Sequence, residues 1–119
     1  MNGSLTRAAT IAVSITVMGA AMASSLVLPN AQSLAGQWQL TDRQQQCRVE
    51  FLAGEQQGVN GYQLWDREHC LKTRFAAEVV GWRPAPDGIA LLQADGSTWV
   101  FFSREGAVYT GAGLTLQAL

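Results

Sequence analysis

The chain has 119 residues, enough for a single domain. Seven of its eight Lys/Arg and all nine Asp/Glu follow residue 23, so that part of the chain has a net charge of 7 − 9 = −2. Because this charge is small and evenly scattered, with no basic stripe, the composition excludes a nucleic-acid-binding or membrane-surface protein.

Residues 1–23 are predicted to be a signal peptide. Arg7 is their only charged side chain, and an uncharged, mostly apolar run follows over residues 8–20. The Ala-Met-Ala sequence at 21–23 then has a small-x-small cleavage pattern, so we expect a mature chain that begins at Ser24. An uncleaved membrane anchor is the alternative, because the uncharged stretch continues to Asp42. The shortness of the apolar part favours cleavage.

Residues 24–33 are predicted to be an N-terminal arm rather than part of the core. Three bulky apolar side chains, Leu26, Val27 and Leu28, precede a Pro-Asn breaker at 29–30. Taken alone, such a segment is also typical of a frayed terminus or a short edge strand.

From Leu34 to the C-terminus the pattern has a period of two residues. Leu34, Gly36, Trp38 and Leu40 fall on one face of the first strand. The predicted strands cover 34–40, 47–51, 62–64, 70–73, 79–83, 89–93, 98–103, 107–110 and 114–118. Eight or nine short strands with regular turn signals predict an all-β domain over 34–119, closed as an up-and-down antiparallel barrel of eight strands. One short turn of helix within 71–80 is an alternative.

The sequence Gly36-Gln37-Trp38 resembles the Gly-x-Trp motif of lipocalin-type barrels. It predicts that Trp38 plugs one end of the barrel and that Gly36 permits close packing; a small-ligand cavity is the functional alternative. A barrel of about 85 residues is filled mainly by its own side chains. The aromatic residues expected to fill it or to cover its ends are Trp65, Trp82, Trp99, Phe101 and Phe102.

Cys47 and Cys70 are the only cysteines. In the oxidising compartment that export implies, we expect them to form a disulfide, which would stabilise the fold by roughly 3–4 kcal/mol. A metal site is the alternative. It would need more ligands than two cysteines and His69, because a structural zinc takes four protein groups.

The sequence offers little for catalysis. His69 is the only histidine, so a Ser-His-Asp arrangement would have to include it, and we expect it in a surface loop. Asp66 and Glu68 are expected in the same solvated loop. No phosphate-binding loop, calcium loop or zinc-protease motif is present, so we predict a protein that is not an enzyme and has no cofactor.

Several segments together match one known family over nearly all of residues 24–111. They are Ser-Ser-Leu-Val-Leu at 24–28, Leu-Ala-Gly-Gln-Trp at 34–38, the two cysteines, Gly-Trp-Arg-Pro-Ala-Pro-Asp-Gly-Ile-Ala-Leu at 81–91 and Gln-Ala-Asp-Gly-Ser at 93–97. On these residues the mature chain resembles the bacterial alkaline protease inhibitor (Inh) family, whose members inhibit serralysin-type zinc metalloproteases.

The resemblance implies a periplasmic, eight-stranded barrel with one disulfide, from a Gram-negative bacterium. It implies that the arm lies in the active-site cleft of the protease and that the α-amino group of Ser24 ligates the catalytic zinc. The residues implied to occupy the primed-side subsites are Ser25, Leu26, Val27 and Leu28. Which barrel loops contact the protease does not follow from the resemblance.

We expect the free protein to be a monomer, with no metal of its own and no membrane contact after signal cleavage. Two other functions are compatible with a small exported barrel. A lipocalin-like carrier of a small apolar ligand would need an internal cavity, and a structural barrel of the cell envelope would not need the arm.

Overall fold

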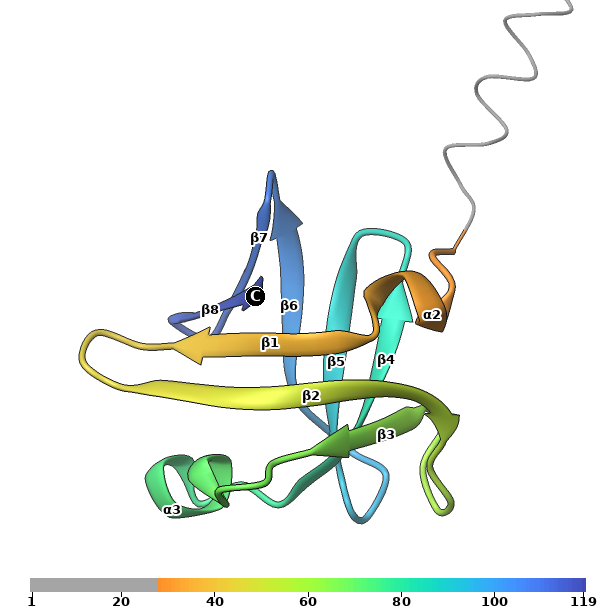
Figure 1. Ribbon diagram of the computed structural model, residues 1–119, viewed down its shortest axis with the longest axis horizontal. Helices are drawn as coiled ribbons and strands as arrows, with labels where there is room; N and C mark the ends of the chain where they lie inside the picture. Colours follow the sequence, from red (N-terminus) through yellow and green to blue (C-terminus); the bar gives the residue numbers. More distant parts are fainter. Residues whose placement is uncertain (1–27) are drawn as a thin grey trace, which may run out of the picture.

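The computed structural model describes residues 28–119, whose eight strands form a closed antiparallel barrel (Figure 1). The strands follow one another around the barrel in chain order, and β8 pairs with β1 to close it. Their bounds are β1 Gly36–Thr41, β2 Gln46–Glu55, β3 Tyr62–Trp65, β4 Val79–Ala85, β5 Gly88–Gln93, β6 Thr98–Glu105, β7 Val108–Gly111 and β8 Leu114–Ala118. The predicted fold class is confirmed.

Two short helices, α2 (Ala31–Leu34) and α3 (Cys70–Phe75), accompany the barrel and lie at opposite ends of the β1–β2 pair (Figure 1). Neither of these helices, nor any other helix of the described residues, has the length and apolar character to span a membrane.

The barrel interior is filled by side chains. The alternation of β1 and β2 turns Trp38, Leu40, Val49 and Phe51 inward, and all four are buried. The Phe51 ring stacks between Trp38 and Trp82, with ring centroids 5.0 and 4.7 Å apart. This aromatic column occupies the space that a carrier would need for an apolar ligand, which counts against the lipocalin-like alternative.

The expected filling by five aromatic residues is correct only in part. Trp82 and Phe102 are fully buried and Trp99 packs at the edge of the core, but Trp65 and Phe101 are 44% and 43% exposed. Neighbouring residues on a strand point to opposite faces, so the inward position of Phe102 turns Phe101 outward. The outward Phe101 ring lies over Gly88, where an added Cβ would come within 2.6 Å of it.

The Gly36-Gln37-Trp38 motif also differs in part from expectation. Trp38 is buried, and its indole Nε1 donates a hydrogen bond to the Leu34 carbonyl oxygen at 2.8 Å. Gly36 does not serve close packing, because a Cβ there would meet nothing within 4 Å. Its φ of +129° is the reason for glycine, since other residues rarely adopt that backbone conformation.

The strand predicted at 70–73 is wrong, because these residues form α3. The carboxylate of Asp66 accepts the backbone N–H groups of Cys70 and Leu71 at 2.8 Å each, which favours a helical turn at this point. The alternative prediction, a short turn of helix within 71–80, agrees better with the position of α3. Asp66, expected in a solvated loop, therefore holds the first turn of α3 through these hydrogen bonds, while Glu68 is exposed.

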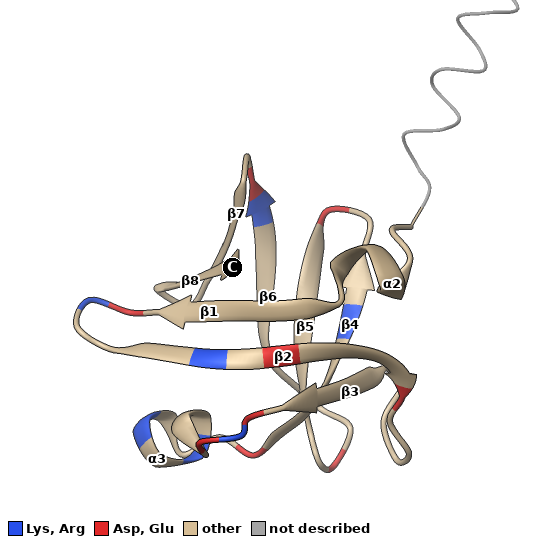
Figure 2. Cartoon of the chain, in the orientation of Figure 1, with Lys and Arg blue, Asp and Glu red and all other residues tan. Residues whose placement is uncertain are grey.

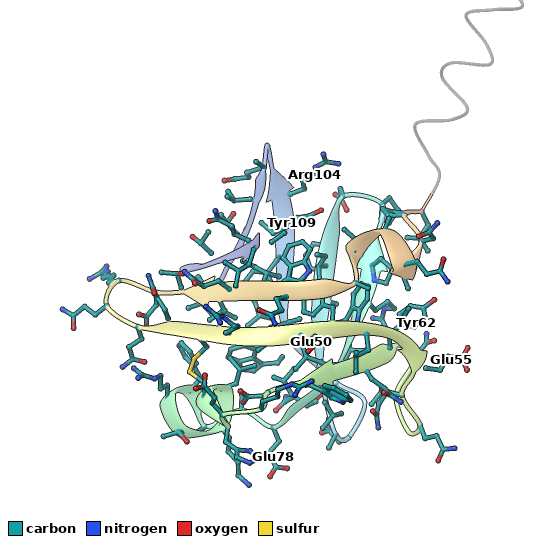
Figure 3. All side chains as sticks on the ribbon, viewed as in Figure 1. Glu50, Glu55, Tyr62, Glu78, Arg104 and Tyr109 are labelled. Atoms are coloured by element: carbon teal, nitrogen blue, oxygen red, sulfur yellow. A yellow bond between two sulfur atoms is a disulfide. The ribbon has the colours of Figure 1, made fainter. Side chains whose placement is uncertain are left out.

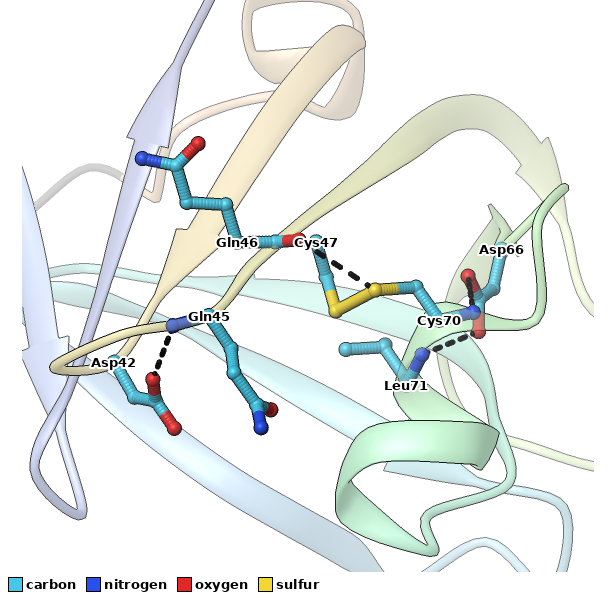
Figure 4. Close-up of a disulfide and its surroundings, with 7 residues drawn as sticks. All are labelled: Asp42, Gln45, Gln46, Cys47, Asp66, Cys70 and Leu71. Atoms are coloured by element: carbon cyan, nitrogen blue, oxygen red, sulfur yellow. Dashed lines mark hydrogen bonds between the residues drawn. A yellow bond between two sulfur atoms is a disulfide. The ribbon is translucent and has the colours of Figure 1, made fainter.

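The predicted disulfide between Cys47 and Cys70 is confirmed (Figure 4). It joins β2 to α3 with a Cα–Cα distance of 5.6 Å. Leu71, the next residue of α3, is fully buried, so the disulfide holds this helix against the end of the barrel.

Candidate functional site

Most residues of the predicted protease-binding segment fall outside the described part of the chain. These are Ser24, Ser25, Leu26 and Val27, together with the predicted signal peptide at 1–23. Leu28 is described, and its side chain is 52% exposed. The candidate site therefore begins at Leu28, where the segment joins the barrel.

The chain after Leu28 is fixed to the barrel by α2. The Asn30 side chain caps this helix by accepting the Ser33 N–H at 2.8 Å, and the Ser33 hydroxyl donates to the Asn30 carbonyl oxygen at 2.8 Å. Ala31 is 8% exposed and belongs to the hydrophobic core. The hydrogen bond from Trp38 to Leu34 fixes the other end of the helix.

Part of the segment predicted as an arm thus packs on the barrel instead. Residues 31–33 are helical, and the boundary between the arm and the folded domain lies near Pro29-Asn30. The Pro-Asn pair is typical of a break, but in the structure Asn30 begins a helix rather than ending an extended segment. A four-residue helix is too short to show a helical period in the sequence.

Beside Leu28 lies a groove of about 420 Å³, which we call the arm-root groove. Its other walls are the β2–β3 loop with Tyr62, and Arg83 and Pro84 at the end of β4. Glu55, the last residue of β2, is also at its edge; Figure 3 shows Glu55 and Tyr62 at the end of the barrel that carries α2. The groove combines apolar, aromatic and charged side chains from three separate segments.

The walls of the arm-root groove are fixed by contacts within the barrel. Arg83 Nη1 donates to the Asn60 carbonyl oxygen at 2.9 Å, and Gln56 N–H donates to the Gly61 carbonyl oxygen at 3.0 Å. Gly61 lies so close to β4 that an added Cβ would be 2.6 Å from the Trp82 carbonyl oxygen. Sequence reasoning did not find this groove, because the pairing of β3 with β4, not sequence proximity, brings the β2–β3 loop to Arg83 and Pro84.

Residues of both charges, Lys/Arg and Asp/Glu, are scattered along the described chain (Figure 2). Hydrogen bonds from the Gln44 and Gln45 amides lower the pKa of Asp42, and the Ser97 hydroxyl and amide lower the pKa of Asp95. Both aspartates stabilise strand connections and neither lines the arm-root groove. These pKa shifts therefore concern the turns and not the candidate site.

The described residues hold no group of three or more His, Cys, Asp or Glu side chains placed to bind a metal ion. His69 is exposed and precedes α3 with a left-handed φ of 54°, beside the disulfide. Over residues 28–119, then, the side chains offer neither a metal centre nor a catalytic histidine within the arm-root groove.

Sequence comparison finds protease inhibitors. A family described as "Protease inhibitor Inh" matches residues 28–116. The "Alkaline proteinase inhibitor" of Serratia marcescens is 60% identical over 124 aligned residues, covering 100% of this chain and 99% of that protein. The "Proteinase inhibitor" of Dickeya chrysanthemi is 44% identical over 86 residues, covering 72% of this chain and 71% of that protein. The "Alkaline proteinase inhibitor" of Photorhabdus luminescens is 39% identical over 95 residues, covering 80% of this chain and 71% of that protein.

Among solved structures, the barrel is similar to the "Crystal structure of a psychrophilic marine protease MP inhibitor". The TM-score is 0.59 at 24% sequence identity, and the match covers 76% of this chain and 100% of that chain. This likeness supports the fold.

Proposed function

The chain belongs to the Inh family of protease inhibitors, and from this membership we propose that it inhibits serralysin-type zinc metalloproteases through its N-terminal arm. It is a proteinase inhibitor and not an enzyme, as the names of its close relatives indicate. The observation that best supports the arm mechanism is the exposed Leu28, which precedes a helix packed on the barrel. Because α2 is fixed to the barrel, it can present residues 24–28 to the active-site cleft of a protease.

The proposed inhibitory group is the α-amino nitrogen of Ser24. A catalytic zinc keeps one coordination position open for water, and a neutral amine can occupy that position. An α-amino group has a pKa of about 7.7–8, so deprotonating it at pH 7 costs only about 1 kcal/mol, against nearly 5 kcal/mol for a lysine. Displacing the water removes the nucleophile of hydrolysis.

The residues after Ser24 would provide the remaining affinity within the cleft. An extended segment can form main-chain hydrogen bonds along a cleft edge while alternate side chains fill pockets. Ser25, Leu26, Val27 and Leu28 would occupy the primed-side subsites. Because the base of the arm is held by α2, less conformational freedom is lost on binding.

We further propose that the protein acts in the periplasm of a Gram-negative bacterium after cleavage behind Ala23. The signal pattern at 1–23 supports export, and an oxidising compartment agrees with the disulfide of Cys47 and Cys70. In this scheme the zinc-binding amine exists only after cleavage, so an uncut precursor folds its barrel yet fails to inhibit.

The direct test is to titrate a serralysin-type protease with the mature protein that begins at Ser24 and to follow peptide hydrolysis. We expect stoichiometric loss of activity, and a protein that begins at Leu28 should inhibit far less. Equal inhibition by both proteins would contradict the role of the arm. Full protease activity in the presence of excess mature protein would contradict the proposed target.

A further inference from the structure

The length of the arm determines which surface of the barrel faces the protease. This step rests on the proposed function. Leu28 is four residues from Ser24, and an extended chain spans at most about 3.3–3.6 Å per residue. With the Ser24 nitrogen on the zinc, Leu28 can lie no further than about 14 Å from the metal. Of the described barrel surface, the part around Leu28 is therefore the part that the arm brings nearest to the cleft.

That surface is the arm-root groove, since Leu28 itself forms one of its walls. We propose that the groove is a second docking surface, which receives a loop from the primed-side rim of the protease cleft. The direction follows from the arm: the chain runs from the zinc toward the primed side and leaves the cleft there.

The chemistry of the groove suits a protein loop. Tyr62 is half-buried, with its ring centroid 5.4 Å from that of the core residue Trp82, so it offers a rigid apolar face. Arg83 uses Nη1 for the Asn60 carbonyl oxygen, and its other N–H groups can donate to carbonyl or carboxylate oxygens of the loop. Tyr and Arg are the residue types that most often dominate binding at protein interfaces.

The groove is also formed before binding. The Arg83–Asn60 hydrogen bond and the close approach of Gly61 to β4 fix the β2–β3 loop. A rigid surface loses little conformational entropy on association, which favours a slow dissociation rate.

The opposite end of the barrel lies away from the arm-root groove. The β1–β2 loop and α3 with the disulfide lie at the far end of the β1–β2 pair from α2 (Figure 1). Substitutions there provide matched controls, because they change the same or a chemically similar residue type without changing the arm-root groove.

The test uses two groove variants and two controls in the mature protein. Asn60→Trp fills the groove but leaves the backbone oxygen that Arg83 contacts, and Gln44→Trp is its control in the β1–β2 loop. Arg83→Ala removes the free donors together with the hydrogen bond to Asn60. Its control is Arg67→Ala in the loop between β3 and α3, which also removes one side-chain hydrogen bond, to Glu50. The inhibition constant and dissociation rate are measured with a serralysin-type protease, and thermal unfolding checks that each variant folds.

We expect Asn60→Trp and Arg83→Ala each to raise the inhibition constant about tenfold or more, mainly through faster dissociation. The two controls should stay within about twofold of the parent protein. Folded groove variants that inhibit as well as their controls would overturn the docking surface while leaving the arm mechanism intact. If the parent protein itself fails to inhibit, both the proposed function and this proposal are overturned.

Discussion

The indole Nε1 of Trp38 and the carbonyl oxygen of Leu34 are joined by a hydrogen bond of 2.8 Å, which ties the last residue of α2 to the first strand of the barrel. Trp38 also stacks on Phe51 inside the barrel. The base of the proposed inhibitory arm is therefore connected directly to the hydrophobic core.

Replacing Trp38 with Phe tests this connection. The variant keeps an aromatic ring in the core but removes the donor to Leu34, so we expect the free energy of unfolding to fall by about 1 kcal/mol or somewhat more, because the ring is also smaller. Inhibition should weaken several-fold, because α2 holds the arm less firmly. Urea denaturation and inhibition assays measure the two effects. Trp99→Phe on β6 is the control, and equal inhibition by both variants would contradict the anchoring role.

Removal of the disulfide should affect stability and not inhibition. Cys47 and Cys70 are 23 residues apart, so replacing both with Ala should lower the free energy of unfolding by about 3.5 kcal/mol on the chain-entropy account. The inhibition constant at a temperature where the variant is folded should match that of the parent, because α3, which begins at Cys70, is distant from α2 (Figure 1). A large loss of inhibition by the folded variant would show that the far end contributes to binding.

The contribution of Asp95 to the free energy of unfolding should decrease at acidic pH. Hydrogen bonds from Ser97 hold the pKa of Asp95 below its ordinary value of 3.8. A carboxyl group with a lowered pKa in the folded state stabilises the protein above its unfolded pKa, and this contribution is lost as the pH falls through the folded value. The stability difference between the parent and Asp95→Asn should thus shrink on acidification below 3.8. The stability difference between the parent and Ser97→Ala, measured by denaturation, should shrink in the same way as the pH falls. A stability difference that does not change with pH would contradict this role of Asp95.

Inhibition should have a pH dependence of its own. The proposed zinc ligand is the neutral amine of Ser24, so protonation competes with binding and inhibition should weaken as the pH falls below about 8. Well below the pKa, the inhibition constant should rise about tenfold per pH unit. The protease without inhibitor, assayed at each pH, corrects for its own titration. An inhibition constant that stays flat from about pH 8.5 to about pH 6 would argue against ligation by the amine.

The sequence predicts the barrel well because alternating burial is a local pattern. Trp38 and Leu40, or Val49 and Phe51, reveal their strands without knowledge of any partner strand. The pattern fails at Cys70 and Leu71, where hydrogen bonds to the Asp66 carboxylate favour a helix that the apolar pattern does not indicate.

The candidate site is less predictable than the fold. The sequence alone predicts an arm at 24–33, with a frayed terminus or an edge strand as the alternative, but the protease-binding role of residues 24–28 follows only from the family that the chain resembles. The arm-root groove depends on the approach of Asn60 to Arg83, which are 23 positions apart and meet only when β3 pairs with β4. Outward-facing Trp65 shows the same limit, because hydrophobicity alone would place it inside.

The most direct test of the arm mechanism is to add one glycine before Ser24 in the mature protein and to measure the inhibition constant with a serralysin-type protease. The same glycine added after the exposed Leu119 is the control, since it changes the composition equally but leaves Ser24 as the first residue. If the Ser24 amine ligates the zinc, the N-terminal addition misplaces it and should weaken inhibition about 100-fold, while the control inhibits like the parent. Equal inhibition by the two extended proteins would contradict the account.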